Sequence, residues 1–167
     1  MPQMTSVRVA SGTGGYSPHR IDPAPDASQH DRASMARGEL IHERLTHSVI
    51  GAFFDVYNTL GFGFLEQAYL GALTVELRER GHRVDREVSV RVMYKGAAIA
   101  WQRLDMIVDS ALVVEVKSTT ELHSSARRQL LSYLCATRLG VGMLLHFGPK
   151  ASFYRLVSER DGPGGKS

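Results

Sequence analysis

A short apolar run that ends in two charges limits the folds open to this chain more than any other segment. The run is LVVEVK, residues Leu112–Lys117, within SALVVEVKSTTEL. Because side chains alternate along a strand, Glu115 and Lys117 share one face with Val113, while the opposite face is entirely aliphatic. A strand as apolar as this is typical of the inside of a sheet, where a charged face does not simply meet solvent. The run therefore predicts a central strand that carries an acid and a base side by side.

Two strands are expected just before this run. In REVSVRVMYKG, valines alternate with polar residues, as in a strand with one buried face, and Lys95-Gly96 makes a turn. The segment AAIAWQRLDMIVDS reads as the next strand and ends in a tight Asp109-Ser110 turn. The pattern predicts a meander of three antiparallel strands. Alternation places Leu104, Met106 and Val108 on one face of the middle strand and Asp105 on the other, within reach of the two charges after the turn.

Helical periodicity appears in three segments, residues 39–61, 64–81 and 121–140, each of which ends at a glycine. Two short strands, in VGMLLHFG and SFYRLV, close the pattern. The third helix is long enough to cross over between the strands on either side of it, which makes those two strands parallel. The expected fold class is therefore α/β, a mixed β-sheet flanked by helices in the order helix, helix, three strands, helix, two strands.

Residues 39–157 are expected to form a single domain. Residues 1–38 are rich in Gly, Ser, Pro and Asp without periodicity, so we expect a disordered N-terminal tail, and residues 158–167 are expected to be a flexible C-terminal tail. The chain has no secretory signal pattern and no apolar run long enough for a membrane span. Cys135 is the only cysteine, which excludes an internal disulfide and a cysteine-built zinc or iron–sulfur site. A cytoplasmic location without membrane contact is expected.

Asp105, Glu115 and Lys117 are the first candidate site. Two neighbouring carboxylates repel each other unless a cation lies between them, and a small number of oxygen ligands suits Mg²⁺ or Mn²⁺. A lysine beside that ion can hold a phosphate or help to deprotonate a water. The alternative for the tetrapeptide VEVK alone is a half-exposed strand with a surface ion pair. The net charge of +3 is compatible with a polyanionic partner and is also ordinary for a small domain.

Polar groups on two helices favour the functional interpretation. Glu66 heads a stripe that is otherwise apolar and faces the core, where a carboxylate needs a partner. On the third helix, Gln129 and Tyr133 lie on one stripe that we expect to face inward. His82 and His123 lie next to elements that could approach the site, although surface or packing roles are more common for a lone histidine. The chain has no Gly-x-Ser-x-Gly elbow and no phosphate-binding P-loop.

The segment GFLEQAY supplies Gly63, Glu66 and Tyr69 in a pattern that resembles the GxxExxY protein family. The later LD, EVK and QLLSY segments follow in the order of that family, from about residue 41 to 157. The family belongs to the PD-(D/E)XK nuclease superfamily, so the resemblance implies a restriction-endonuclease-like core. Leu104 stands where the superfamily name has proline, and His146 stands where the family more often has asparagine.

The resemblance also implies roles for the site residues. Asp105 and Glu115 are expected to bind a metal ion, either Mg²⁺ or Mn²⁺, and Lys117 is expected to be catalytic. Glu66 is the helix acid that supports the metal or its water, and Gln129 and Tyr133 form the Q-x-x-x-Y element that orients the site.

The function expected from this resemblance is metal-dependent hydrolysis of phosphodiester bonds in nucleic acid, either DNA or RNA. Two alternatives remain open. One is a nucleic-acid-binding module that keeps the fold without turnover. The other is a subunit of a larger complex or a homo-oligomer that acts through an exposed apolar face.

Overall fold

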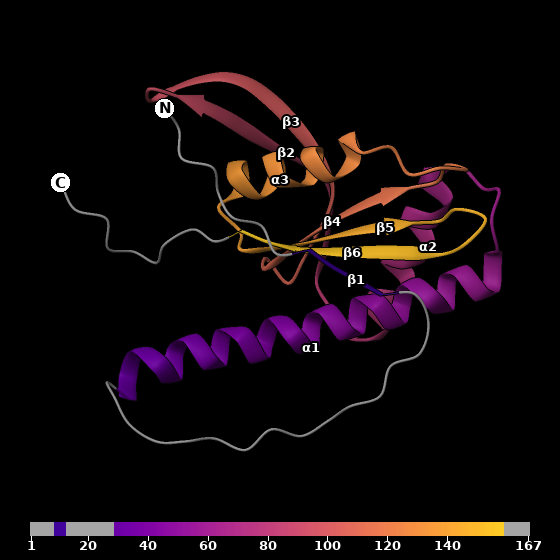
Figure 1. The fold of residues 1–167 in the computed structure, drawn as a ribbon, viewed down its shortest axis with the longest axis horizontal. Helices are drawn as coiled ribbons and strands as arrows, with labels where there is room; N and C mark the ends of the chain where they lie inside the picture. The colour runs from indigo at the N-terminus through magenta and orange to yellow at the C-terminus, as the bar shows by residue number, and fades with distance from the viewer. Residues whose placement is uncertain (1–8, 13–28, 159–167) are drawn as a thin grey trace.

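The computed structural model describes residues 9–12 and 29–158, which form one mixed sheet with helices on both faces (Figure 1). The six strands are arranged in the order β1-β6-β5-β4-β3-β2. β4 and β5 are parallel, and every other neighbouring pair is antiparallel. The bounds of the strands are β1 Val9–Gly12, β2 Val84–Tyr94, β3 Ala97–Val108, β4 Leu112–Lys117, β5 Val141–His146 and β6 Ser152–Val157.

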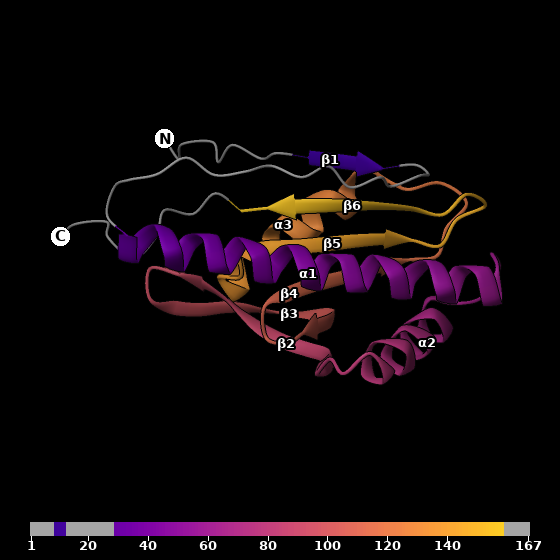
Figure 2. The ribbon, with the colours of Figure 1, turned by 90° about the horizontal axis from the view of Figure 1, so that it is seen from below.

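The helices divide into two layers. α1 (Gln29–Leu60) and α2 (Glu66–Glu79) pack on one face of the sheet, and α3 (Ser125–Thr137) packs on the other, as Figures 1 and 2 show. The larger hydrophobic cluster lies between the sheet and the α1–α2 layer, and the smaller one lies under α3. β4 is buried on both faces, which explains its nearly continuous apolar sequence.

The expected order of elements is confirmed. β2, β3 and β4 form the antiparallel meander, and α3 is the crossover between the parallel strands β4 and β5. Both predicted turns are tight. Lys95 and Gly96 have φ values of 48° and 82°, and Asp109 and Ser110 have values of 51° and 56°. Positive φ at both central positions gives a turn whose twist matches that of the flanking strands.

The described structure differs from the sequence prediction at the N-terminal side. α1 begins at Gln29, ten residues before the expected start, and β1 pairs with β6 at the edge of the sheet. β1 and the first ten residues of α1 fall within residues 1–38, which we predicted to lack regular structure. Predictions for residues 1–8, 13–28 and 159–167 lie outside the described residues. In the described part of the chain, no helix is both long enough and apolar enough to cross a membrane.

The prediction that Leu104 shares a face with Met106 and Val108 is wrong. Leu104 packs in the cluster under α3, whereas Met106 and Val108 pack in the cluster under α1 and α2. Pairing between β2 and β3 is interrupted between these positions, where Glu87 adopts a positive φ of 50°. The register of the two strands is the same on both sides of this interruption, so the change of face arises at the unpaired residues Glu87 and Asp105. The reversal occurs at Asp105.

Candidate active site

β3 and β4 separate at Asp105, and the candidate site lies in this fork. Met106 and Val114 are the last paired residues of the two strands on this side. One residue further along, the Oδ2 atom of Asp105 accepts a hydrogen bond of 2.9 Å from the backbone N–H of Val116. A side chain thus replaces the backbone acceptor that a regular ladder would supply. This hydrogen bond holds the carboxylate of Asp105 next to the charged end of β4.

Glu115 is buried in the fork with one oxygen atom that has no partner. Its exposed fraction is 1%, and its Oε1 atom accepts a hydrogen bond of 2.6 Å from Nζ of Lys117. The Oε2 atom is buried without a hydrogen-bond partner. Burial, followed by the nearby charge of Asp105, raises the pKa of Glu115 from 4.5 to about 7, although Lys117 opposes the shift. Metal-free protein therefore holds a carboxylate that resists ionisation.

Lys117 connects this buried acid to the surface. Its side chain is 21% exposed, whereas that of Glu115 is 2% exposed. Burial lowers the pKa of Lys117, but the hydrogen bond and charge of Glu115, together with the charges of Glu66 and Asp105, outweigh burial, so the pKa lies above its ordinary value. Lys117 is therefore a cation at neutral pH, at the mouth of the site.

Glu66 reaches the same place from the start of α2. It is partly buried, as expected, and its Oε2 atom accepts a hydrogen bond of 3.3 Å from the backbone N–H of Ser118. The hydroxyl of Ser118 donates to the carbonyl of Phe64 at 2.6 Å, which ties the loop before α2 to the end of β4. The charge of Glu66 contributes to the raised pKa of Glu115. The structure thus brings Glu66, Asp105, Glu115 and Lys117 together.

Gly63 and Tyr69 shape the loop that places Glu66. Gly63 has a φ of 122°, a region open only to glycine. The Tyr69 hydroxyl donates to the carbonyl of Gly61 at 2.6 Å and accepts from the N–H of Phe64 at 3.2 Å. The Tyr69 ring stacks on Phe147 with 4.1 Å between ring centroids. The spacing of glycine, acid and tyrosine therefore fits a turn, a carboxylate that reaches the fork and an anchor for the loop.

Tyr69→Phe tests this anchor. The variant keeps the stacked ring but loses both hydrogen bonds of the hydroxyl, so we expect the free energy of unfolding to fall by about 1–2 kcal/mol. Urea denaturation of the variant against wild type measures the change. Tyr154→Phe on β6 is the matched control, because it removes a hydroxyl outside this loop. Equal stability of Tyr69→Phe and wild type would show that the hydroxyl does not hold the loop.

Gln129 and Tyr133 also meet, but only one of them is buried. Nε2 of Gln129 donates to the Tyr133 hydroxyl at 2.5 Å, and this hydroxyl donates to the carbonyl of Arg103 at 3.2 Å. The expectation that both residues face inward is wrong for Gln129, which is exposed, while Leu130 is buried in the core. Their hydrogen bonds link α3 to β3 two residues before Asp105.

Tyr133 also responds to the charges of the site. Burial raises the pKa of Tyr133 above its ordinary value. The hydrogen bond from Gln129 lowers it, and the charges of Glu115 and Asp105 raise it again. Tyr133 therefore lies close enough to the two carboxylates for their charges to raise its pKa.

His146 supports the site in a way that the sequence did not indicate. It lies opposite Lys117 in the β4–β5 ladder and is buried, with Nε2 at 2.7 Å from the carbonyl oxygen of Thr119. Gly148 makes room for the ring, because a Cβ atom there would lie 2.5 Å from Cε1 of His146. His146 thus fixes the loop that leaves the site after Lys117. Only the pairing of β4 with β5, which is not local in sequence, reveals this role.

The two other histidines considered in the sequence, His82 and His123, lie elsewhere. His82 contacts Asp109 through Nδ1 and Ser48 through Nε2, both at 2.7 Å. These residue types could suggest a serine–histidine–aspartate catalytic triad. Ser48 lies inside α1, however, where the helix uses the backbone N–H groups, so none of them can stabilise an oxyanion. The three residues therefore link α1 to the β3–β4 turn. His123 contacts Ser125 at the start of α3 at 2.7 Å.

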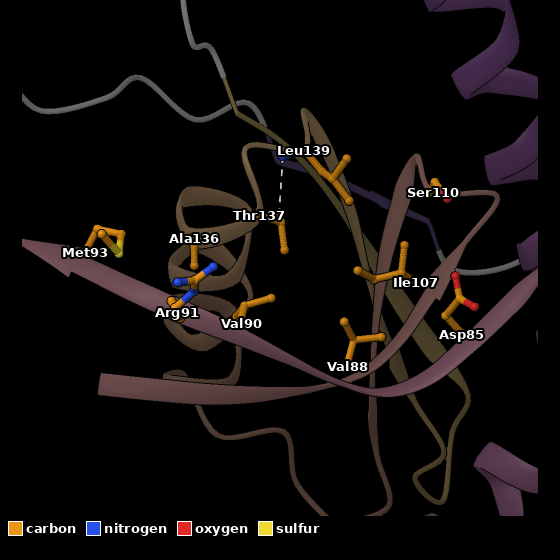
Figure 3. Close-up of a pocket in the computed structure, with 10 residues that line it drawn as sticks. All are labelled: Asp85, Val88, Val90, Arg91, Met93, Ile107, Ser110, Ala136, Thr137 and Leu139. Carbon is orange, nitrogen blue, oxygen red and sulfur yellow. Dashed lines mark hydrogen bonds between the residues drawn. The ribbon is translucent and has the colours of Figure 1, made fainter. Parts of the chain in front are cut away.

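A hollow of about 650 Å³ lies on the α3 side of the sheet, away from these carboxylates (Figure 3). Its lining includes Arg91 and Met93 of β2 and Thr137 near the end of α3. None of the predicted site residues lines it. The candidate site is therefore the fork between β3 and β4 and not this hollow.

Comparison with known proteins agrees with the fold. The family model described as the PD-(D/E)XK nuclease superfamily matches residues 43–156. The chain belongs to the PD-(D/E)XK nuclease superfamily. No curated protein matches the chain.

One solved structure, titled "Crystal structure of SSO0001", is 21% identical to this PD-(D/E)XK chain with a TM-score of 0.39. The similar region covers 57% of this chain and 53% of that chain.

Proposed function

We propose that this chain is a divalent-metal-dependent nuclease of the GxxExxY type that hydrolyses phosphodiester bonds in nucleic acid. One observation carries the proposal. Glu115 is buried beside Asp105, with one oxygen bound to Lys117 and the other without a partner. A buried acceptor with no partner costs stability and is rare unless a ligand uses it. Membership of a nuclease superfamily supports the same reaction class.

The residues of the fork fit Mg²⁺ or Mn²⁺. Asp105 and Glu115 would hold the cation through carboxylate oxygens, and Mg²⁺ usually keeps several waters when it binds one or two carboxylates. Among the described residues, no group of three or more His, Cys, Asp or Glu side chains is close enough to bind a metal ion together. Glu66, whose Oε2 atom accepts a hydrogen bond from the Ser118 N–H, would support the metal ion or its water. The bound cation would supply Lewis-acid charge and lower the pKa of water.

The other roles in the proposed reaction fall to side chains of the protein. Lys117, a cation at the mouth of the site, is placed to offset negative charge that develops on phosphorus oxygens. Glu66 can accept a proton or orient a water from the far side of the fork. Gln129 and Tyr133 hold β3 at Arg103 and so keep Asp105 in position.

Cleavage of labelled single- and double-stranded DNA and RNA tests the proposed function. Activity with Mg²⁺ or Mn²⁺ that disappears with EDTA is expected for at least one substrate. Absence of cleavage of every substrate with either metal would contradict the enzyme assignment. A nucleic-acid-binding module without turnover is the second candidate. It is favoured by the ion pair that ties Nζ of Lys117 to Glu115, because a lysine held this way is less free to meet a substrate.

Metal binding has a readout that does not depend on activity. A ligand that binds only the folded state raises the thermal midpoint by mass action. We expect Mn²⁺ or Mg²⁺ to raise the midpoint of wild type but not of an Asp105→Asn, Glu115→Gln double variant, which has the same shape without the charges. Differential scanning fluorimetry with and without metal measures this. An equal rise in both proteins would contradict the assignment of Asp105 and Glu115 as ligands.

A further inference from the structure

Large apolar side chains are exposed along the hairpin that β2 and β3 form. Met93, Tyr94, Ile99 and Trp101 are 55%, 59%, 62% and 67% exposed. In Figure 1 the tip of this hairpin reaches past α3, away from α1. We call residues 88–103 the hairpin arm. Exposed apolar side chains gathered in one place mark an interaction surface more often than scattered ones do.

Cations accompany the aromatic rings of the hairpin arm. Arg91 lies directly opposite Trp101 in the ladder, and its Cζ atom is 5.7 Å from the centroid of the indole ring. At the tip, Nζ of Lys95 lies 5.4 Å from the centroid of the Tyr94 ring. Each aromatic ring of the arm thus has a cation beside it and retains more than half of its surface in solvent.

All charged side chains of the hairpin arm are positive. Residues 88–103 contain Arg91, Lys95 and Arg103 and no Asp or Glu. The carboxylate of Glu87, just outside the arm, is 3.8 Å from Arg103, and both side chains are largely exposed, so it offsets little of this charge. A polyanion therefore complements the arm. A second copy of the arm would bring three cations against three and is disfavoured.

The hairpin arm continues directly from the candidate site. Trp101 precedes Asp105 by four residues on β3, which is about 13 Å at the usual rise of 3.2–3.4 Å per residue. The base of the arm is held to α3 by the bond from the Tyr133 hydroxyl to the carbonyl of Arg103. The hairpin arm and the fork are therefore consecutive stretches of β3.

We propose that the hairpin arm binds a single-stranded stretch of nucleic acid next to the cleavage site, with bases stacked on Trp101 and Tyr94 and phosphates near Arg91 and Lys95. Base faces are available for stacking in a single strand but are covered in a duplex. The proposal rests on the proposed function for its biological meaning. Binding to the arm can nevertheless be measured without cleavage.

Trp101 makes the test direct because it is the only tryptophan of the chain. Its fluorescence should fall to a saturable limit when a single-stranded oligonucleotide is added to the full chain in EDTA, where no metal-dependent cleavage occurs. A duplex of the same sequence should produce a smaller change. The anisotropy of the same oligonucleotide, carrying a dye, gives the affinity independently.

Five variants separate stacking from charge. Trp101→Ala should weaken binding roughly 5- to 150-fold, the range for loss of one stacked base, and Trp101→Phe should restore much of it. Val75→Ala, which truncates an exposed apolar residue of α2, should leave affinity unchanged. Arg91→Gln should reduce the slope of log K against log salt by about 0.7, the value for one phosphate of a single strand. Arg83→Gln, just before the start of β2, should leave the slope unchanged.

Three results would overturn the proposal. In the first, the oligonucleotide binds by anisotropy while Trp101 fluorescence does not change, which places binding elsewhere. In the second, Trp101→Ala and Val75→Ala bind equally well. In the third, fluorescence changes with protein concentration alone and sedimentation shows a dimer, so that a second copy covers the arm. Failure of cleavage with normal binding would contradict only the proposed function, and normal cleavage with an unchanged Trp101 signal would contradict only the arm.

Discussion

Lys117→Met is expected to reduce metal-dependent cleavage roughly 100- to 1,000-fold, the usual cost of removing one group that stabilises transition-state charge. Methionine keeps the length of the side chain and its packing but removes the cation at the mouth of the fork. Single-turnover cleavage with metal in excess measures the loss at the chemical step. Lys150→Met is the matched control, because Lys150 is an exposed lysine in the turn between β5 and β6.

The fold of Lys117→Met should survive the change. Removing one partner of a buried ion pair is severe when the other charge stays buried. Glu115 avoids that outcome because its pKa of about 7 already allows it to take up a proton near neutral pH. The circular dichroism spectrum should therefore match wild type. A folded variant that cleaves as fast as wild type would remove Lys117 from the mechanism and favour the binding module.

Local pattern explains why much of the fold could be predicted. Each strand of the meander carries its own alternation and ends at a two-residue turn, so neighbouring residues alone indicate the Lys95-Gly96 and Asp109-Ser110 connections. The parallel pairing of β4 and β5 followed from the length of the intervening helix. The first residue of α1 was predicted wrongly, because this helix begins ten residues before its apolar pattern becomes regular. Helix propensity without a regular apolar stripe in the sequence gives little signal in that stretch.

The site could be predicted only in part, for a different reason. Glu66, Asp105, Glu115 and Lys117 were recognised because charges stand out on apolar elements. The interruption at Asp105 that turns Leu104 to the other face depends on how β3 pairs with β2, and regular alternation hides it. Likewise, His146 acquires its role only because β5 lies beside β4. Contacts between elements, and not residue type, decide such features.

Gln129 shows the same limit on a helix. A helical wheel of α3 places Gln129 and Tyr133 on one stripe, but a stripe does not tell which of its members the sheet covers. Tyr133 is covered, and Gln129 stands at the edge, where its amide reaches the hydroxyl. The pair thus works as a linkage to β3 and not as two inward-facing groups.

Glu115→Gln is expected to make the metal-free protein more stable than wild type at pH 8 and to abolish metal-dependent cleavage. The folded state binds the Glu115 proton more tightly than the unfolded chain does, since the pKa rises from 4.5 to about 7 on folding. This stabilising contribution is fully present below pH 4.5 and is lost as pH rises through the interval from 4.5 to about 7. The whole loss corresponds to about 3 kcal/mol. Glutamine cannot ionise, so the variant does not lose this stability as pH rises.

Urea denaturation in EDTA between pH 4.5 and 8 measures this difference. The variant and wild type should diverge with rising pH by up to about 3 kcal/mol, whereas Glu43→Gln, at an exposed position of α1, should follow wild type throughout. Glutamine still offers Lys117 an acceptor oxygen in the same place. If Glu115→Gln instead loses more than about 1 kcal/mol at pH 8, the charge of Glu115 stabilises the metal-free fold through Lys117. The fork would then be built around an ion pair, and the buried Oε2 atom would need an explanation other than a metal ion.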